Sequence, residues 1–208
     1  MGKDFTSALR PAIVMTILFA ALLGIVYPLA MTGIGQAIFP HQANGSLVTD
    51  ARGRIVGSAV VGQAFVANRY FQTRPSAAGK GYDGLASSGS NLGPASQALV
   101  DRVKPDVEKR HAEGVTDPIP ADLATASGSG LDPDLSPAAA QAQAPRIAHI
   151  RDIAPDRVRA LIIGQTEGSV FGEPHVNVLA LNQALEPFFR FGSRHFPLMP
   201  VFGDVHVY

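Results

Sequence analysis

The chain has 208 residues, of which 46% are hydrophobic, and it carries 17 Lys and Arg against 17 Asp and Glu. This hydrophobic content is enough for one sizeable folded domain, and it excludes a chain that is disordered throughout. The balanced charge supplies no basic surface, so no nucleic-acid partner is expected. The absence of cysteine excludes disulfides, thiolate nucleophiles and cysteine-ligated zinc, but it does not fix the compartment.

The first predicted element is a single membrane-spanning helix. Residues 12–31, "AIVMTILFAALLGIVYPLAM", are almost continuously apolar, and no Asp, Glu, Lys or Arg lies between Arg10 and Asp50. A helix of this length spans the hydrocarbon core of a bilayer, and the run is longer than the apolar region of a cleaved signal peptide. We therefore expect an uncleaved transmembrane helix over residues 11–39.

The charges on either side of this helix predict its orientation. Lys3 and Arg10 precede the apolar run, whereas the other flank carries only His41 before Arg52. Because positive charges are retained on the cytoplasmic side, residues 1–10 are expected to be cytoplasmic. Residues from about 41 onward are then expected to lie on the outer side of the membrane.

The helix also carries small side chains at four-residue spacing. Thr16, Ala20 and Gly24 would form a smooth stripe on one face, where a second helix could approach closely. Small residues are common in membrane helices, so a packing stripe and an incidental spacing are both left open. Pro28 and Gly33 are expected to bend or end the helix near the outer interface.

Residues 40–185 are predicted to form a mixed α/β (α+β) domain. Residues 46–61 contain two β-branched runs on either side of residues 50–53, which indicates a hairpin with a tight turn. Residues 63–93 follow neither a helical nor a strand period, and their many Gly, Ser and Pro residues predict an ordered loop.

Three helices and a further strand complete this domain. Helices are expected over residues 94–114, 136–150 and 155–163, each with a Pro near its start. In the first of them, an apolar stripe is made by Leu99, Val103 and Val107. Alternation in "HVNVLAL" predicts a strand over residues 175–181.

No motif predicts catalysis by this chain. "RPSAAGKG" lacks the Gly and the Ser or Thr of a phosphate-binding loop, and the six histidines lack metal-ligand spacing. No serine lies in a nucleophile elbow. A membrane-anchored external hydrolase that uses Ser129, Asp132 and a histidine remains open as an alternative. A second alternative is a pilin-like structural subunit, suggested by "DFTSAL" before an apolar helix.

Five stretches, in this order after one membrane helix, resemble a known family. They are "GSAVVGQAF" at residues 57–65, "YFQTRPSA" at 70–77, "SSGSNLGP" at 87–94, "IPADLATASGSGLDPDLSPAAA" at 119–140 and "GEPHVNVLALNQAL" at 172–185. On these stretches, the chain is identified as a member of the family of C subunits of the Kdp potassium-transporting P-type ATPase of bacteria.

The resemblance implies an accessory, non-pumping subunit of an ATP-driven potassium uptake complex. Its expected roles are assembly of the complex and an effect on the ATP affinity of the catalytic subunit. The implied partners are a channel-like subunit that translocates potassium and a P-type subunit that hydrolyses ATP. No cofactor is expected in this chain, whereas the complex uses ATP, magnesium and potassium. The implied location is the bacterial inner membrane, with a single pass and a periplasmic domain.

The Gly- and Ser-rich stretch at residues 125–137 is then interpreted as a rigid docking loop for these partners. The expected docking residues in it are Ser127, Gly128, Ser129, Gly130, Leu131 and Asp132. Asn91, Arg74 and Tyr70, from other family stretches, either belong to the same surface or brace the loop from behind.

Two positions and one segment depart from the family pattern. Asp134 stands where the family usually has His, so no role of an imidazole carries over to it. Ser88 replaces a usual Gly or Ala. Residues 186–208 form an aromatic-rich tail beyond the usual end of the family. Packing on the domain, contact with the bilayer interface and disorder all remain open for this tail.

Overall fold

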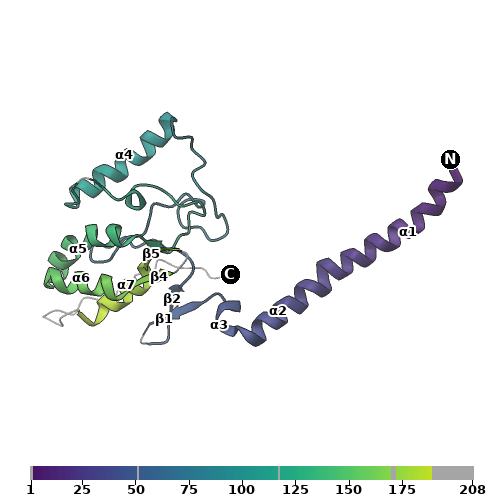
Figure 1. Ribbon diagram of the computed structural model, residues 1–208, viewed down its shortest axis with the longest axis horizontal. Coiled ribbons are helices and arrows are strands. Elements are labelled where there is room, and N and C mark those ends of the chain that lie inside the picture. The colour runs from purple at the N-terminus through teal and green to yellow at the C-terminus, as the bar shows by residue number, and fades with distance from the viewer. Residues whose placement is uncertain (1, 51, 117, 170–171, 189–208) are drawn as a thin grey trace. The chain divides into compact units, whose positions relative to one another are not determined.

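The computed structural model describes residues 2–50, 52–116, 118–169 and 172–188 (Figure 1). The chain divides into two compact units, Met1–Leu47 and Val48–Tyr208. Of the predicted segments, most of the aromatic tail at residues 186–208 lies outside the described residues.

The N-terminal unit is built from one long run of helix. It comprises α1 (Gly2–Ala21), a π-helical segment (Leu22–Val26) and α2 (Tyr27–Ile38), followed by the short α3 (Pro40–Ala43). Within Ser7–Ile38, the most apolar 18-residue window has a mean hydropathy of 2.4, and none of it is buried in the protein. By length and composition, this is the one described segment that qualifies as a membrane span.

Pro28 and Gly33 were predicted to bend or end the helix, and neither residue ends it. Pro28 is tolerated because it lies in the first turn of α2, directly after the π-helical segment. Because proline has no backbone N–H, one helical hydrogen bond is missing there, and the wider π-helical turn accommodates this loss. Phe39 ends α2 with a φ of −129°.

The second unit holds the remaining helices and strands. In chain order these are β2 (Ile55–Ser58), α4 (Gln97–Ala112), a 3₁₀ turn (Ala121–Leu123), β3 (Asp134–Leu135), α5 (Pro137–Arg151), α6 (Pro155–Gly164), β4 (Thr166–Ser169), β5 (Gly172–Asn177), α7 (Val178–Leu185) and a 3₁₀ turn (Glu186–Phe188). Strand β1 (Leu47–Thr49) joins the two units and pairs with β2. The α+β class is confirmed.

The strands form two small sheets. The predicted hairpin is present as β1 and β2, closed by a hydrogen bond of 2.9 Å from the Asp50 N–H to the Arg54 carbonyl. The second sheet has the order β3-β5-β4, in which Val176 of β5 faces Leu135 of β3 and Thr166 of β4. All pairs in this second sheet are antiparallel, so it needs no crossover helix.

The core lies between this sheet and helices α5, α6 and α7. Ala139, Ala140 and Ile147 of α5 pack with Val158 and Ile162 of α6, and all are almost completely buried. Small alanines on α5 let the helices approach closely. Ser136 caps this helix by accepting a hydrogen bond of 3.1 Å from the Ala139 N–H, as its Ser-Pro sequence predicts.

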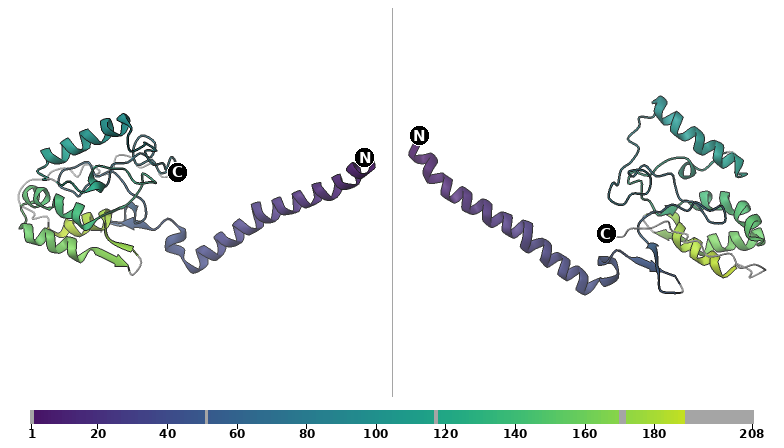
Figure 2. Two further views of the ribbon diagram at one scale, coloured as in Figure 1. Left: turned by 45° about the horizontal axis from the view of Figure 1, so that its top comes forward. Right: turned by 180° about the vertical axis from the view of Figure 1, so that it is seen from behind.

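Helix α4 lies apart from this core. Figures 1 and 2 show it along one side of the second unit, with irregular chain between it and helices α5 to α7. Leu99, Val103 and Val107 are only partly buried, and the core cluster of the described residues includes no residue of α4. The one buried residue of α4 is Arg110. The apolar stripe predicted for this helix therefore does not anchor it.

Two predicted boundaries are wrong. Helix α4 starts at Gln97 instead of 94, because Ser96 occupies the cap position with extended backbone. The strand predicted over residues 175–181 ends at Asn177, whose side chain caps α7 by accepting a hydrogen bond of 3.1 Å from the Ala180 N–H. The alternation was ambiguous because Val178, Leu181 and Leu185 also fit one helical face.

Candidate docking surface

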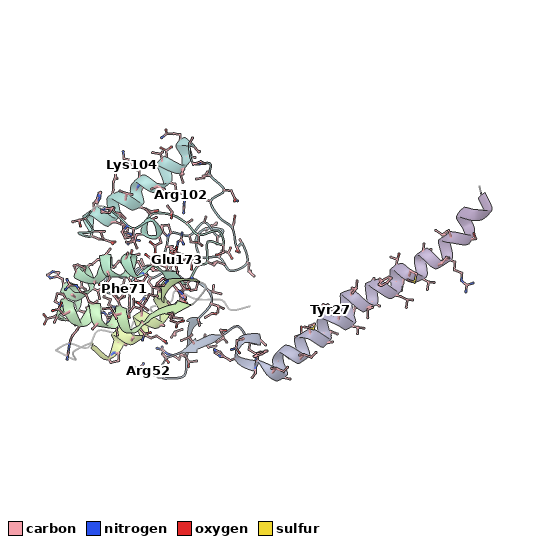
Figure 3. All side chains as sticks on the ribbon, in the orientation of Figure 1. Tyr27, Arg52, Phe71, Arg102, Lys104 and Glu173 are labelled. Carbon is pink, nitrogen blue, oxygen red and sulfur yellow. The ribbon has the colours of Figure 1, made fainter. Side chains whose placement is uncertain are left out.

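Two buried amide side chains hold the backbone of the loop that begins at Tyr70. Asn182 of α7 accepts a hydrogen bond of 2.8 Å from the Phe71 N–H and donates one of 3.0 Å to the Phe71 carbonyl. Gln143 of α5 pairs in the same way with Gln72, at 2.9 and 3.1 Å. These amides satisfy backbone groups that a sheet would otherwise satisfy. The buried Phe71 is labelled in Figure 3.

Asp132, in the loop at residues 125–137, forms an ion pair with Arg74, another of the candidate docking residues. Arg74 Nη1 lies 3.1 Å from Asp132 Oδ2, and the two side chains are 25% and 29% exposed. The same guanidinium donates to the carbonyls of Thr125 at 3.5 Å and Ala126 at 3.4 Å. Asp132 Oδ1 also accepts a hydrogen bond of 3.1 Å from the Asp134 N–H. Arg74 and Asp132 therefore brace the loop.

The centre of the loop packs on a neighbouring stretch of chain. The Ser88 N–H donates to the Ser129 carbonyl at 2.9 Å, and Ser76 Oγ donates to the Gly130 carbonyl at 2.6 Å. Gly130 has a φ of +68°, and a Cβ there would lie 2.6 Å from the Ala78 nitrogen. Both observations require glycine at residue 130. The role of Gly130 is therefore structural.

The tip of the loop remains open. A Cβ on Gly128 would meet nothing within 4 Å, and Gly128 and Ser129 are both exposed. Ser127 Oγ lies 3.3 Å from Ser129 Oγ. Leu131 is partly buried, and its carbonyl accepts a hydrogen bond of 2.7 Å from the Gly62 N–H. The surface that the loop offers is thus the backbone and hydroxyls around residues 127–129.

Tyr70 belongs to the core. Its side chain is 8% exposed, and the guanidinium carbons of Arg69 and Arg151 lie 5.1 and 5.0 Å from its ring centroid. Burial, with a smaller contribution from Glu186, raises the pKa of its phenol, so the ring stays neutral. Tyr70 therefore braces the domain. Asn91, by contrast, is exposed, with a φ of 52°.

The small residues of the membrane helix are all exposed. Thr16 and Ala20 lie in α1, whereas Gly24 lies in the π-helical segment. A Cβ on Gly24 would meet no atom within 4 Å. The surface around these residues is therefore free in the isolated chain, and its use as a helix-packing stripe stays a prediction.

Ser129, the candidate nucleophile of the hydrolase alternative, makes other contacts. Ser129 Oγ accepts a hydrogen bond of 3.1 Å from the Leu131 N–H, and Asp132 is paired with Arg74. Over the described ranges, no group of three or more His, Asp or Glu side chains could hold a metal ion. The geometry at Ser129 therefore gives the hydrolase alternative no support.

Asp134 lines a hollow of about 300 Å³ between the two sheets. Burial raises the pKa of its carboxyl, and a hydrogen bond of 3.0 Å from Asn177 Nδ2 opposes that shift. The same amide donates to the Ala59 carbonyl at 2.9 Å. Asn177 thereby ties the end of the hairpin to the second sheet. Asp134 stands where the family usually has His. Its carboxylate accepts the hydrogen bond from Asn177 Nδ2, so this contact needs no imidazole at residue 134.

Asn182 and Gln143, which hold the loop that begins at Tyr70, were not predicted from the sequence. Asn182 and Gln143 each occupy a core-facing position of an apolar helix, where a polar side chain must find a buried partner. That pattern was the available signal. It marks both residues as paired, although it does not say with which atoms.

The comparisons with known proteins identify the family. A family model described as "K+-transporting ATPase, c chain" matches residues 9–187. The chain belongs to the KdpC family. The match ends where the predicted aromatic tail begins.

Three relatives share the name "Potassium-transporting ATPase KdpC subunit". The protein of Caulobacter vibrioides is 55% identical over 183 residues, which are 86% of this chain and 93% of the relative. The protein of Myxococcus xanthus is 50% identical, with 92% of this chain and 90% of the relative covered. The protein of Rhodopseudomonas palustris is 49% identical, with 86% and 96% covered. Membership of the KdpC family leaves the pilin-like alternative without support.

Proposed function

We propose that this chain is an accessory, non-pumping subunit of an ATP-driven potassium uptake complex, and that it is needed for assembly. Membership of the KdpC family carries the proposal. The long apolar helix and the compact domain with a braced loop fit a subunit that holds partners together. No cofactor is assigned to this chain, whereas ATP, magnesium and potassium are used by the complex.

The proposed location is the bacterial inner membrane, with a cytoplasmic N-terminus and a periplasmic domain. Lys3 and Arg10 precede the apolar helix, and the next Lys or Arg is Arg52. This distribution supports a cytoplasmic N-terminus. The proposed partners are the channel-like subunit that translocates potassium and the P-type subunit that hydrolyses ATP.

An effect on ATP affinity would have to be indirect. With this orientation, only about ten residues lie in the cytoplasm, where ATP is found. The effect would therefore pass through membrane contacts, for which the exposed stripe of Thr16, Ala20 and Gly24 is a candidate. The outer domain is better suited to act as a clamp or cover at the outer mouth of the potassium pathway.

The loop at residues 125–137 is the proposed docking element. Its base is fixed by the Arg74–Asp132 ion pair, and its exposed tip presents Gly128 and Ser129. A braced loop loses little conformational entropy on binding, so more of the contact energy contributes to affinity. This rigidity supports a docking role.

The test is co-purification of the tagged chain with its two proposed partners after gentle solubilisation. We expect a stable complex whose ATP hydrolysis is stimulated by potassium, and we expect both properties to be lost when this chain is omitted. Partners that assemble and pump without the chain would overturn the proposal.

A further inference from the structure

Charged and polar contacts, instead of apolar packing, attach α4 to the outer domain. Arg110, which is 3% exposed, donates to Gln72 Oε1 at 2.9 Å and to the Leu123 carbonyl at 3.2 Å. It also lies 3.0 Å from Glu113 Oε2. Lys109 Nζ donates to the same Gln72 oxygen at 2.9 Å. Helix α4 is therefore held near its C-terminal end, along one edge.

A hollow of about 380 Å³ lies between α4 and the loop at residues 64–82. Its lining residues are Ala64, Phe65, Val66, Gln72, Thr73, Pro75, Ser76, Tyr82, Arg102, Asp106, Lys109 and Arg110. The charged lining residues are three cations and one carboxylate, and Glu113, which pairs with Arg110 and Lys109, offsets a further positive charge, so an excess of one remains. The hollow therefore attracts an anionic group.

One of these cations is not used by the fold. Among the described residues, the guanidinium of Arg102 makes no hydrogen bond and no ion pair, and it interacts only electrostatically, with Asp106. Arg102 is partly buried, whereas the side chain of Lys104 is 71% exposed. Figure 3 labels Arg102 on the side of α4 that faces the other elements of the second unit. The guanidinium of Arg102 is therefore available to a ligand.

The rim of the same hollow is apolar and exposed. Val66 is 86% exposed, and it lies beside Phe65, which is 8% exposed and belongs to the core. Thr73 and Tyr82 are fixed in the floor, since their hydroxyls donate to the carbonyls of Gln63 at 2.9 Å and Arg74 at 2.6 Å. An accessible arginine next to an exposed apolar side chain on a rigid base is typical of the centre of a protein interface.

We propose that this hollow receives an acidic side chain, with an apolar neighbour, from another subunit of the potassium-transporting ATPase. The proposal rests on the accessory-subunit function, and it names a surface for it that is separate from the loop at residues 125–137. A carboxylate would accept a forked pair of hydrogen bonds from Arg102, and the apolar neighbour would cover Val66.

Other anionic occupants fit less well. Membrane-surface binding uses clusters of about four to eight basic residues, more than this hollow provides. Inorganic phosphate prefers backbone N–H groups at a helix N-terminus. The residues of α4 that line the hollow begin at Arg102, beyond the first turn of the helix, where the backbone N–H groups are already paired. A single carboxylate therefore matches the modest excess charge best.

Charge reversal on α4 tests the site. The full chain is co-expressed with its partners as wild type, R102E, R102K or K104E, and retention of the partners is measured through rising NaCl concentrations. R102E and K104E change the net charge equally on one helix, and Arg102 has no hydrogen bond to lose. We expect R102E to weaken retention at least about tenfold, which is near the lower end of the effect of removing one partner of a close charge pair. R102K keeps the charge but loses the fork, so it should weaken retention less than R102E does, and K104E should behave like the wild type.

A crosslink identifies the occupant. In R102K, the introduced amine can be coupled to a nearby carboxylate with a carbodiimide, and mass spectrometry then locates the partner residue. Lys104 in the same chain is the internal control. We expect an acidic residue of a partner subunit to be coupled at residue 102, whereas Lys104, which lies 3.9 Å from Glu108, should couple only within the chain. Circular dichroism of each variant checks that the fold is retained.

Several results would overturn the proposal. One is equal retention of R102E and K104E in a complex that assembles normally. Another is binding of inorganic phosphate, or of vesicles of anionic lipid, to the isolated chain in a way that depends on Arg102, while assembly of the complex does not depend on Arg102. If the wild-type chain does not associate with the partners at all, the accessory-subunit function and this site are both wrong. Association of the wild-type chain with the partners therefore distinguishes failure of this site from failure of the accessory-subunit function.

Discussion

Replacing Asn182 by Asp tests whether one buried amide holds the loop at residue 71. The substitution preserves shape and keeps the oxygen that accepts the 2.8 Å hydrogen bond from the Phe71 N–H. It removes the amide donor of the 3.0 Å bond to the Phe71 carbonyl. Two oxygens then face each other at a site that is 3% exposed. Only a protonated carboxyl could restore both bonds.

The magnitude follows from the free energy of protonation. An Asp with an unfolded pKa of about 3.9 costs roughly 4 kcal/mol to keep protonated at pH 7, at about 1.4 kcal/mol per pH unit. Leaving the Phe71 carbonyl unpaired and the charge buried has a cost of similar size. We therefore expect a loss of about 3–4 kcal/mol at pH 7. For a unit of this size, that loss lowers the unfolding midpoint by about 10 °C.

The loss depends on pH with a definite sign. Burial raises the folded-state pKa of the new carboxyl, so the native state binds the proton more tightly than the unfolded state. The penalty is therefore largest above the raised pKa and disappears as the pH falls toward about 3.9. The difference in midpoint between variant and wild type should shrink steadily through this range.

The assay is thermal unfolding of the full chain in detergent, followed by circular dichroism at several pH values. The control is Gln183→Glu on the same helix, whose amide makes only an exposed bond of 3.3 Å to the Thr49 carbonyl. We expect the control to change stability by less than about 0.5 kcal/mol. A variant at residue 182 that is no less stable than this control, or that does not recover in acid, would refute the reasoning.

Three further predictions concern the loop and its surroundings. Gly130→Ala should cost about 1–3 kcal/mol in thermal unfolding because residue 130 has a φ of +68°, whereas Gly128→Ala at the open tip should be nearly neutral; equal effects would contradict the packing. Asp132→Ala breaks a partly exposed pair with Arg74, so it should cost at most about 1 kcal/mol yet weaken co-purification or raise the potassium KM; no change in either would remove the main support for docking. Burial raises the pKa of Asp134 above its ordinary 3.8, so stability falls as pH rises through the folded pKa, and Asp134→Asn should abolish that fall in a series of unfolding midpoints.

Local pattern in the sequence was sufficient for the elements that depend on near neighbours. The long apolar run, the hairpin around residues 50–53, and the Ser-Pro start of α5 all appear where they were predicted. Each is determined by hydropathy, turn chemistry or capping within a few residues. The resemblance to the KdpC family likewise needed only the order of five stretches, and the family match over residues 9–187 confirms it.

The tertiary structure decided which polar groups are paired, and thus which remain available to a partner. The Asn182–Phe71 and Gln143–Gln72 pairs join residues that are 111 and 71 positions apart, so no local pattern contains them. The same is true of the Arg74–Asp132 pair, which joins a predicted docking residue, Asp132, to Arg74, for which docking and bracing were both open. Sequence alone could name the charged and polar side chains. It could not determine their partners, because a buried hydrogen bond is set by where distant segments meet.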